Sequence, residues 1–181
     1  MIVLGVDPGS RITGYGVIET TPAGERLIDF GVLRLDDGDD HPLKLKTIHE
    51  RLLEVIDQWH PDVCAIEMPV YAQNAQSMLK LGRAQAAAML SALVRQVPVV
   101  EYTPKEVKKS VTGNGSATKE QVGYMVRTIL AMRPDADLVP HDASDALAVS
   151  ICHAHRSARG VKAGSGSSWK RFIAENPGRV G

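Results

Sequence analysis

Four acidic residues lie at three separated places in this sequence, and each is an unusual place for a carboxylate. Two follow directly after short apolar runs, and two stand three residues apart at the start of an alanine-rich stretch. Burying an unpaired carboxylate costs several kcal/mol unless solvent or a cation meets it. Carboxylates brought together also repel one another, and a divalent cation removes that repulsion. The pattern therefore suggests Mg²⁺ or Mn²⁺ chemistry on a phosphate. The four residues are Asp7, Glu67, Asp142 and Asp145.

The apolar runs in front of the first two acids predict buried strands. Ile2–Val6 leads into Asp7, and Val63–Ile66 leads into Glu67. Turn signals near residues 22–24 separate two further strand-like segments, so the first three strands are expected to form an antiparallel meander. The other strand-like segments are Thr13–Ile18, Leu27–Leu35 and Val97–Tyr102.

The second pair of acids stands at the start of a predicted final helix that begins near His141. Residues at positions i and i+3 share a helix face, so Asp142 and Asp145 can point at one site. A simpler interpretation makes Asp142 a helix N-cap and Asp145 a first-turn acid that favours the helix dipole. That interpretation explains these two residues but not the acids at the strand ends.

Helical spacing of apolar residues predicts the remaining elements. The resulting order is three strands, helix, strand, helix, strand and then helices, which is typical of an α/β protein with a mixed five-stranded sheet flanked by helices. The predicted helices cover Pro42 to Trp59, Asn74 to Gln96 and Lys119 to about Met132, with a helical turn over Val107–Val111.

The predicted helix over 74–96 has an unusual face of small residues. Two interpretations remain open: the face packs closely on the sheet, or it contacts a second copy of the chain. The residues are Gly82, Ala84, Ala86, Ala87, Ala88 and Ala92.

The composition is that of an ordinary globular protein, with 44% hydrophobic and 23% charged residues. Cys64 and Cys152 lie inside apolar segments, so we expect them to pack as small hydrophobic residues in a reducing compartment. The start lacks the features of a signal peptide, and no apolar run approaches the roughly 20 residues needed to span a bilayer. These features favour the cytoplasm and argue against a membrane partner.

The net charge of +0 argues against a nucleic-acid binder only when it is taken alone. Residues 73–133 hold nine Lys and Arg but three Asp and Glu. Local patches matter more than total charge for attracting a polyanion, so this middle segment is a candidate nucleic-acid surface.

An ordered set of motifs occurs in residues 2–17, Ala65–Glu67, Leu79–Arg83, Gln121 with Met125–Leu130, and Asp142–Ala148. This set resembles the RuvC family of bacterial Holliday-junction resolvases, which belongs to the ribonuclease H-like superfamily. The resemblance runs from residue 1 to about 157, and it implies that Asp7, Glu67, Asp142 and Asp145 are catalytic metal ligands. It also implies a homodimer that uses Mg²⁺ or Mn²⁺, two ions per active site, and nicks a four-way DNA junction symmetrically.

The same resemblance implies 5′-phosphate and 3′-hydroxyl products, a role in recombination and repair, and cooperation with the RuvA–RuvB branch-migration machinery. It places DNA-contacting lysines at Lys108 and Lys119, and Lys105 and Lys109 could widen that surface, as could Lys80 and Arg127. The predicted nuclease domain covers residues 1–158. The Gly, Ser, Lys and Arg-rich residues 159–181 are expected to form a disordered basic tail.

One departure from the family concerns the loop after Glu67. Val70 occupies the position where the family usually carries a junction-wedging aromatic, and Tyr71 follows it. Tyr71 either takes over base stacking or packs as an ordinary loop residue.

Three histidines carry weaker hypotheses. His141 either neighbours the helix cap or shares the face of Asp145 and touches a metal or the attacking water. His153 and His155 resemble a metal pair, but they lie far along the helix from Asp142 and are expected at the surface.

Three alternatives of other kinds are considered. A ribonuclease H-like enzyme acting on RNA or hybrids is disfavoured by the specific segments above. An ATP-binding domain of the actin type needs two domains and a second phosphate loop, for which 181 residues are too few. A silent junction-binding module is disfavoured because all four acids are present.

Overall fold

The sheet consists of five strands: β1 (Ile2–Asp7), β2 (Ile12–Thr21), β3 (Gly24–Arg34), β4 (Val63–Glu67) and β5 (Val99–Tyr102). Their order across the sheet is β3-β2-β1-β4-β5. β1, β2 and β3 are antiparallel neighbours, whereas β4 is parallel to β1 and β5 is parallel to β4. The predicted meander followed by parallel strands is therefore confirmed.

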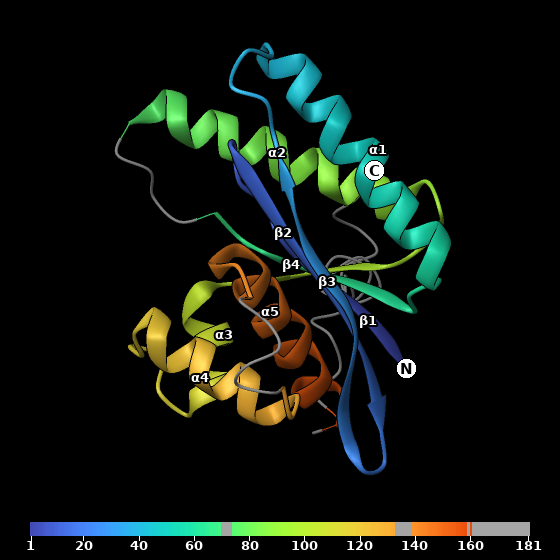
Figure 1. The fold of residues 1–181 in the computed structure, drawn as a ribbon, viewed down its shortest axis with the longest axis vertical. Helices are drawn as coiled ribbons and strands as arrows, with labels where there is room; N and C mark the ends of the chain where they lie inside the picture. The colour runs from blue at the N-terminus through green and yellow to red at the C-terminus, as the bar shows by residue number, and fades with distance from the viewer. Residues whose placement is uncertain (70–73, 133–138, 159, 161–181) are drawn as a thin grey trace, which may run out of the picture.

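The five helices are α1 (His41–Trp59), α2 (Ala75–Leu93), α3 (Pro104–Thr112), α4 (Lys119–Ile129) and α5 (His141–Ala158). This computed structural model describes residues 1–69, 74–132, 139–158 and 160. Figure 1 shows α1 and α2 on one face of the sheet and α3, α4 and α5 on the other. Two apolar clusters fill the two interfaces, which gives the three-layer α/β/α arrangement.

Several element bounds differ from those predicted by the sequence, and local capping explains two of the differences. α3 is a full helix, because Thr103 forms a reciprocal capping box with Glu106 and starts the helix at Pro104. α4 ends at Ile129 rather than near Met132, since Ala131 has a positive φ of 47° that leaves the helical region.

Close approach of α5 to the sheet requires glycine on β1 and β2. A Cβ on Gly5 would collide with the carbonyl oxygen of Ala146, and a Cβ on Gly14 would collide with that of Asp142. These glycines let α5 lie directly on the two strands, so the sheet and the start of α5 are held together by backbone contact.

The small-residue face of α2 resolves into two parts. Ala84, Ala87, Ala88 and Ala92 are buried in the core shared with α1 and the sheet, so the packing interpretation is confirmed for them. A separate apolar stripe of α2 faces outward, and each of its large residues is more than half exposed. The stripe consists of Leu79, Ala86, Leu90, Leu93 and Val94.

The cysteine prediction is confirmed, because Cys64 and Cys152 are both buried and free. Within the part of the chain that the structure describes, no helix is long and apolar enough to cross a membrane. The predicted tail from residue 159 lies outside the described residues, apart from Gly160.

Candidate active site

Asp7 and Glu67 lie side by side at the ends of two adjacent parallel strands. Val6 is paired with Ile66, so the next residue of each strand occupies the neighbouring position. Side chains alternate between the two faces of a strand, and Gly5 faces α5. Asp7, two residues further on, therefore points to the same face, toward the start of α5.

The start of α5 reaches this position through β2. Asp7 is paired with Gly14 across the antiparallel strands. Because Gly14 lies directly beneath the backbone of Asp142, the first turn of α5 sits above the end of β1. Asp145 follows one turn later and shares a helix face with Asp142.

A pocket of about 270 Å³ opens between β1, β4, α3, α4 and α5. Three of the four predicted acids line it, together with two predicted lysines. Asp142 does not line the pocket, although its charge acts on Asp7. The lining residues are Asp7, Glu67, Asp145, Lys108, Lys119, Pro104, Val107, Val122 and Ala148.

Burial and mutual repulsion raise the pKa values of the two strand-end acids. Burial, then the charges of Asp145 and Asp142, raise the pKa of Asp7 to about 7. Burial, then the charges of Asp7 and Asp145, raise the pKa of Glu67 to about 8. Burial and repulsion therefore make the charged forms of both acids costly in this pocket, and a bound cation would lower both pKa values.

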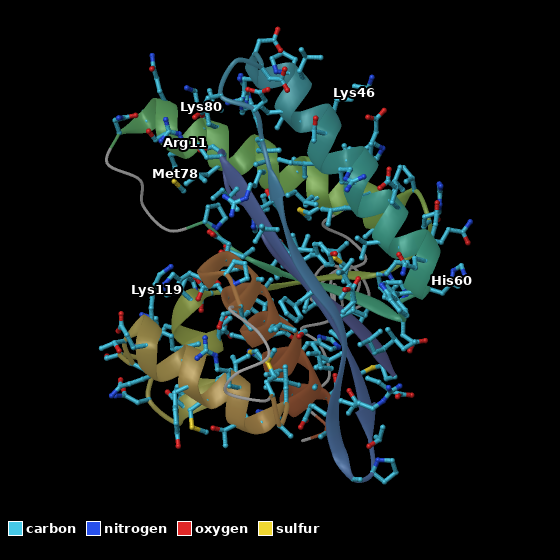
Figure 2. The ribbon with its side chains drawn as sticks, in the orientation of Figure 1. Arg11, Lys46, His60, Met78, Lys80 and Lys119 are labelled. Carbon is cyan, nitrogen blue, oxygen red and sulfur yellow. The ribbon has the colours of Figure 1, made fainter. Side chains whose placement is uncertain are left out.

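Lys119 supplies part of that compensation. Its Nζ donates to Asp145 Oδ2 at 2.8 Å, and this hydrogen bond, with nearby Asp7 and Asp142, raises the pKa of the Lys119 ammonium. Lys119 is the first residue of α4, and the capping box of Thr118 and Gln121 fixes where that helix begins. In Figure 2, Lys119 lies on the left side of the molecule, near the place where α3, α4 and α5 meet.

The donor set fits a hard divalent cation, since it consists of carboxylate oxygens that repel one another. Among the described residues, however, no three His, Cys, Asp or Glu side chains are gathered closely enough to hold a metal ion as they stand. The acids therefore share a pocket without forming a closed ligand cluster, and a cation that entered would draw them inward against their repulsion.

The remaining predicted residues take different positions. Lys105 and Lys109 are exposed on α3 and do not line the pocket, although Lys105 contacts Gly115 in the following loop. His141 is exposed, and its charge helps to lower the pKa of Glu120, after the hydrogen bond from Thr118 and other causes. The predictions for Val70 and Tyr71 fall outside the described residues.

The expectation that His153 lies on the surface is wrong. Its side chain is buried, and its Nδ1 shares a hydrogen bond of 2.8 Å with the hydroxyl of Tyr102, while its Nε2 contacts Ser157. His155 is partly buried, with its Nδ1 near Ser110. Both differ from the prediction because α3 and β5 cover this side of α5, a tertiary contact that local sequence does not reveal.

Tyr102, which no sequence pattern singles out, also supports the site. Tyr102 is paired with Glu67 across β4 and β5, and it joins that strand to His153 on α5. His153 follows Asp145 by two helical turns on the same face. One buried hydrogen bond therefore ties the strand next to Glu67 to the helix that carries Asp145.

Comparisons with known proteins give a consistent result over nearly the whole chain. The family model of crossover junction endodeoxyribonuclease RuvC matches residues 3–153. The crossover junction endodeoxyribonuclease RuvC of Salinibacter ruber is 55% identical over 180 residues, which is 99% of each chain.

Solved structures agree with the sequence comparison. A structure of Thermus thermophilus RuvC superposes with a TM-score of 0.80 at 32% identity, covering 88% of this chain and 97% of that one. The same protein in complex with Holliday junction substrate gives a TM-score of 0.79 at 31% identity, with the same coverage. The predicted ribonuclease H-like arrangement of strands and helices is thus confirmed.

Proposed function

This chain belongs to the RuvC family of crossover junction endodeoxyribonucleases, and we propose that it cuts four-way DNA junctions at the pocket formed by β1, β4 and α5. The observation that supports this most strongly is the adjacency of Asp7 and Glu67 beneath the first turns of α5. Three chain segments far apart in sequence bring carboxylates to one place, as phosphodiester hydrolysis with divalent metals requires.

Nucleases of this family depend on divalent metals. In this chain Asp7, Glu67, Asp142 and Asp145 would hold Mg²⁺ or Mn²⁺, two ions in each site during catalysis. When bound, the ions supply an activated water and neutralise charge on the leaving oxygen. The raised pKa values of Asp7 and Glu67 support this assignment, since a cation would relieve the repulsion that raises them.

The two pocket lysines would act on the DNA rather than on the water. Lys108 and Lys119 line the pocket together with the acids, where the phosphate of a bound strand would carry its negative charge. Lys119 would leave Asp145 for that phosphate, because a cation at Asp145 repels the ammonium. Lys105 and Lys109 would extend the contact along the same DNA arm.

We further propose a homodimer built on the outward stripe of α2. Leu79, Leu90, Leu93 and Val94 repeat at helical spacing and are each more than half exposed, which is unusual for large aliphatic side chains in a row. A two-fold axis beside α2 would make the same stripe serve both copies. Two related pockets would then nick two strands of like polarity and leave 5′-phosphate and 3′-hydroxyl ends.

Three finer proposals rest on the family resemblance. Tyr71, next to Val70, would stack on a base at the junction centre. RuvA–RuvB would deliver the junction, and the protein would work in the cytoplasm.

The test compares a mobile four-way DNA junction with duplex DNA of the same sequence and with an RNA–DNA hybrid, each in Mg²⁺, Mn²⁺ or EDTA. We expect paired, metal-dependent nicks on the junction alone. Cleavage of the hybrid would favour an enzyme acting on RNA, and binding without cleavage in either metal would favour a silent binding module.

A further inference from the structure

A second cationic surface lies away from the pocket, where the first turn of α1 lies near the second and third turns of α2. The α1–α2 basic patch consists of His41, Lys44, Lys80 and Arg83. Lys80 and Arg83 are exposed, and neither forms an ion pair with a carboxylate of the described residues. The pocket of acids includes none of the four.

The packing of α1 on α2 explains why these residues come together. His49 near the middle of α1 contacts Ser91 of α2, 42 residues later in the chain. Asp57 near the end of α1 accepts two hydrogen bonds from Arg95, just after α2 and 38 residues later. Later residues of α1 thus contact later residues of the α2 segment. The two helices therefore run in the same direction, and the same offset sets His41 opposite Arg83. Figure 1 shows both helices running from the upper left of the view toward the right, and the charges acting on His41 place the start of α1 near Lys80 and Arg83 of α2.

The local field at this edge is positive. Burial lowers the pKa of His41, and the charges of Arg83, Lys80 and Lys44 lower it further, whereas Asp40 alone opposes them. Lys44 is itself mostly covered and lies 3.9 Å from Asp37, so it contributes to the field more than to contact.

One polar atom in the patch also lacks a partner. His41 Nε2 is buried and makes no hydrogen bond to any residue that the structure describes. Because this atom is buried, the groups within reach of an anion are the exposed ammonium of Lys80 and the exposed guanidinium of Arg83, both of which donate to negatively charged acceptors. Phosphates of a nucleic-acid backbone supply such acceptors in series.

We infer that the α1–α2 basic patch binds the phosphate backbone of one junction arm outside the cutting pocket, with Lys80 and Arg83 as the contacting cations. This inference rests on the proposed junction-cutting function. Figure 2 shows Lys80 at the start of α2 on the left side of the molecule, the same side as Lys119. A strand held at the pocket and at the patch would be fixed at two points, which sets the angle of the arm.

The patch also borders the proposed dimer stripe. Arg83 follows Leu79 by four residues and precedes Leu90 by seven, so it shares the helix face of the stripe, with Lys80 beside it. In a two-fold dimer the two patches would therefore flank the axis, and each would serve one arm.

The test measures junction affinity in EDTA over a range of salt concentrations for wild type and for K80Q/R83Q. Each lost phosphate contact lowers the slope of log affinity against log salt by about 0.9, so we expect the slope to fall by about 1 to 2. We also expect the double variant to bind junctions with long DNA arms about tenfold more weakly than wild type does. This difference should vanish as the arms are shortened stepwise, because a short arm no longer reaches the patch. The single variant K80Q should give about half of this change in the salt slope. Because it leaves Arg83 in place, it does not alter the proposed dimer stripe.

The matched control is K46Q/R51Q, which removes the same charge from α1 at residues already paired with Glu50 and Glu54. Its slope should stay that of wild type. Sedimentation should show unchanged pairing for this control and for K80Q, which leaves the stripe intact. An unchanged slope for K80Q/R83Q, or an equal loss in the control, would overturn the patch while leaving the proposed function intact. Failure of the wild-type protein to bind junctions at all would instead overturn the proposed function.

Discussion

The ammonium of Lys119 lies 2.8 Å from Asp145 Oδ2, inside the pocket that Asp7 and Glu67 also line. Without other cations, Lys119 is thus the positive charge closest to the acids on α5. Its side chain remains 66% exposed, so it can swing out, whereas Asp145 is only 19% exposed. The same lysine can therefore pair with Asp145 and later meet a DNA phosphate.

Replacement of Lys119 by alanine should separate these two roles. The protein alone should bind Mn²⁺ more tightly, because Asp145 loses its competing partner. Junction binding should weaken by about 1 kcal/mol or more, with a salt slope lower by about 0.9. Calorimetry with Mn²⁺ and a salt series with junction DNA measure the two effects. Lys109→Ala is the control for metal binding, and weaker Mn²⁺ binding by the Lys119 variant would contradict the account.

A methyl group at position 14 should disturb the site more than it disturbs the fold. Gly14→Ala places a Cβ against the carbonyl oxygen of Asp142, so α5 must shift, at a cost of about 1–3 kcal/mol in the free energy of unfolding. Cleavage should fall further than stability explains. Gly123→Ala on α4 meets only ordinary contact at 3.5 Å and should be neutral or stabilising. Chemical denaturation measures the free energy of unfolding, and a junction assay measures cleavage. Equal stability and equal cleavage of the two variants would contradict the close packing of α5 on Gly14.

Much of this arrangement could be predicted from the sequence, because it depends on local patterns. Apolar runs place Asp7 and Glu67 at strand ends, and helical spacing places Asp142 and Asp145 on one face. The burial of His153 could not be predicted, since it depends on Tyr102, which is 51 residues away. Nor does local sequence show that Lys119 reaches Asp145.

The metal-free protein should lose stability as pH rises between about 4 and about 8. An acid whose pKa is raised by folding binds its proton more tightly in the folded state, so the free energy of unfolding falls as pH rises through that window. Asp7 and Glu67, with pKa values raised to about 7 and about 8, are such acids. Melting temperatures in EDTA should show a shallower decline for Asp7→Asn than for wild type. Identical pH profiles would remove Asp7 as a source of the effect.

A charge on the outward stripe of α2 should break the proposed dimer. Leu90→Glu puts a carboxylate where two copies would meet, so sedimentation should give a monomer, and the paired nicks should become single, uncoordinated ones. Leu43→Glu on α1, at a residue that is equally exposed (49%), serves as control and should leave pairing unchanged. A dimeric Leu90 variant would place the interface elsewhere, and a monomeric wild type would contradict the proposed dimer.

The most direct test of the metal-site claim is junction cleavage by Asp7→Asn in Mg²⁺ and in Mn²⁺, with binding measured on the same samples in EDTA. The change keeps the shape of the side chain and removes one charged ligand, so we predict that cleavage falls by more than about a hundredfold while junction affinity stays that of wild type. Asp57→Asn, which alters an exposed acid paired with Arg95, should cleave normally. Cleavage by the Asp7 variant near the wild-type rate would contradict the account.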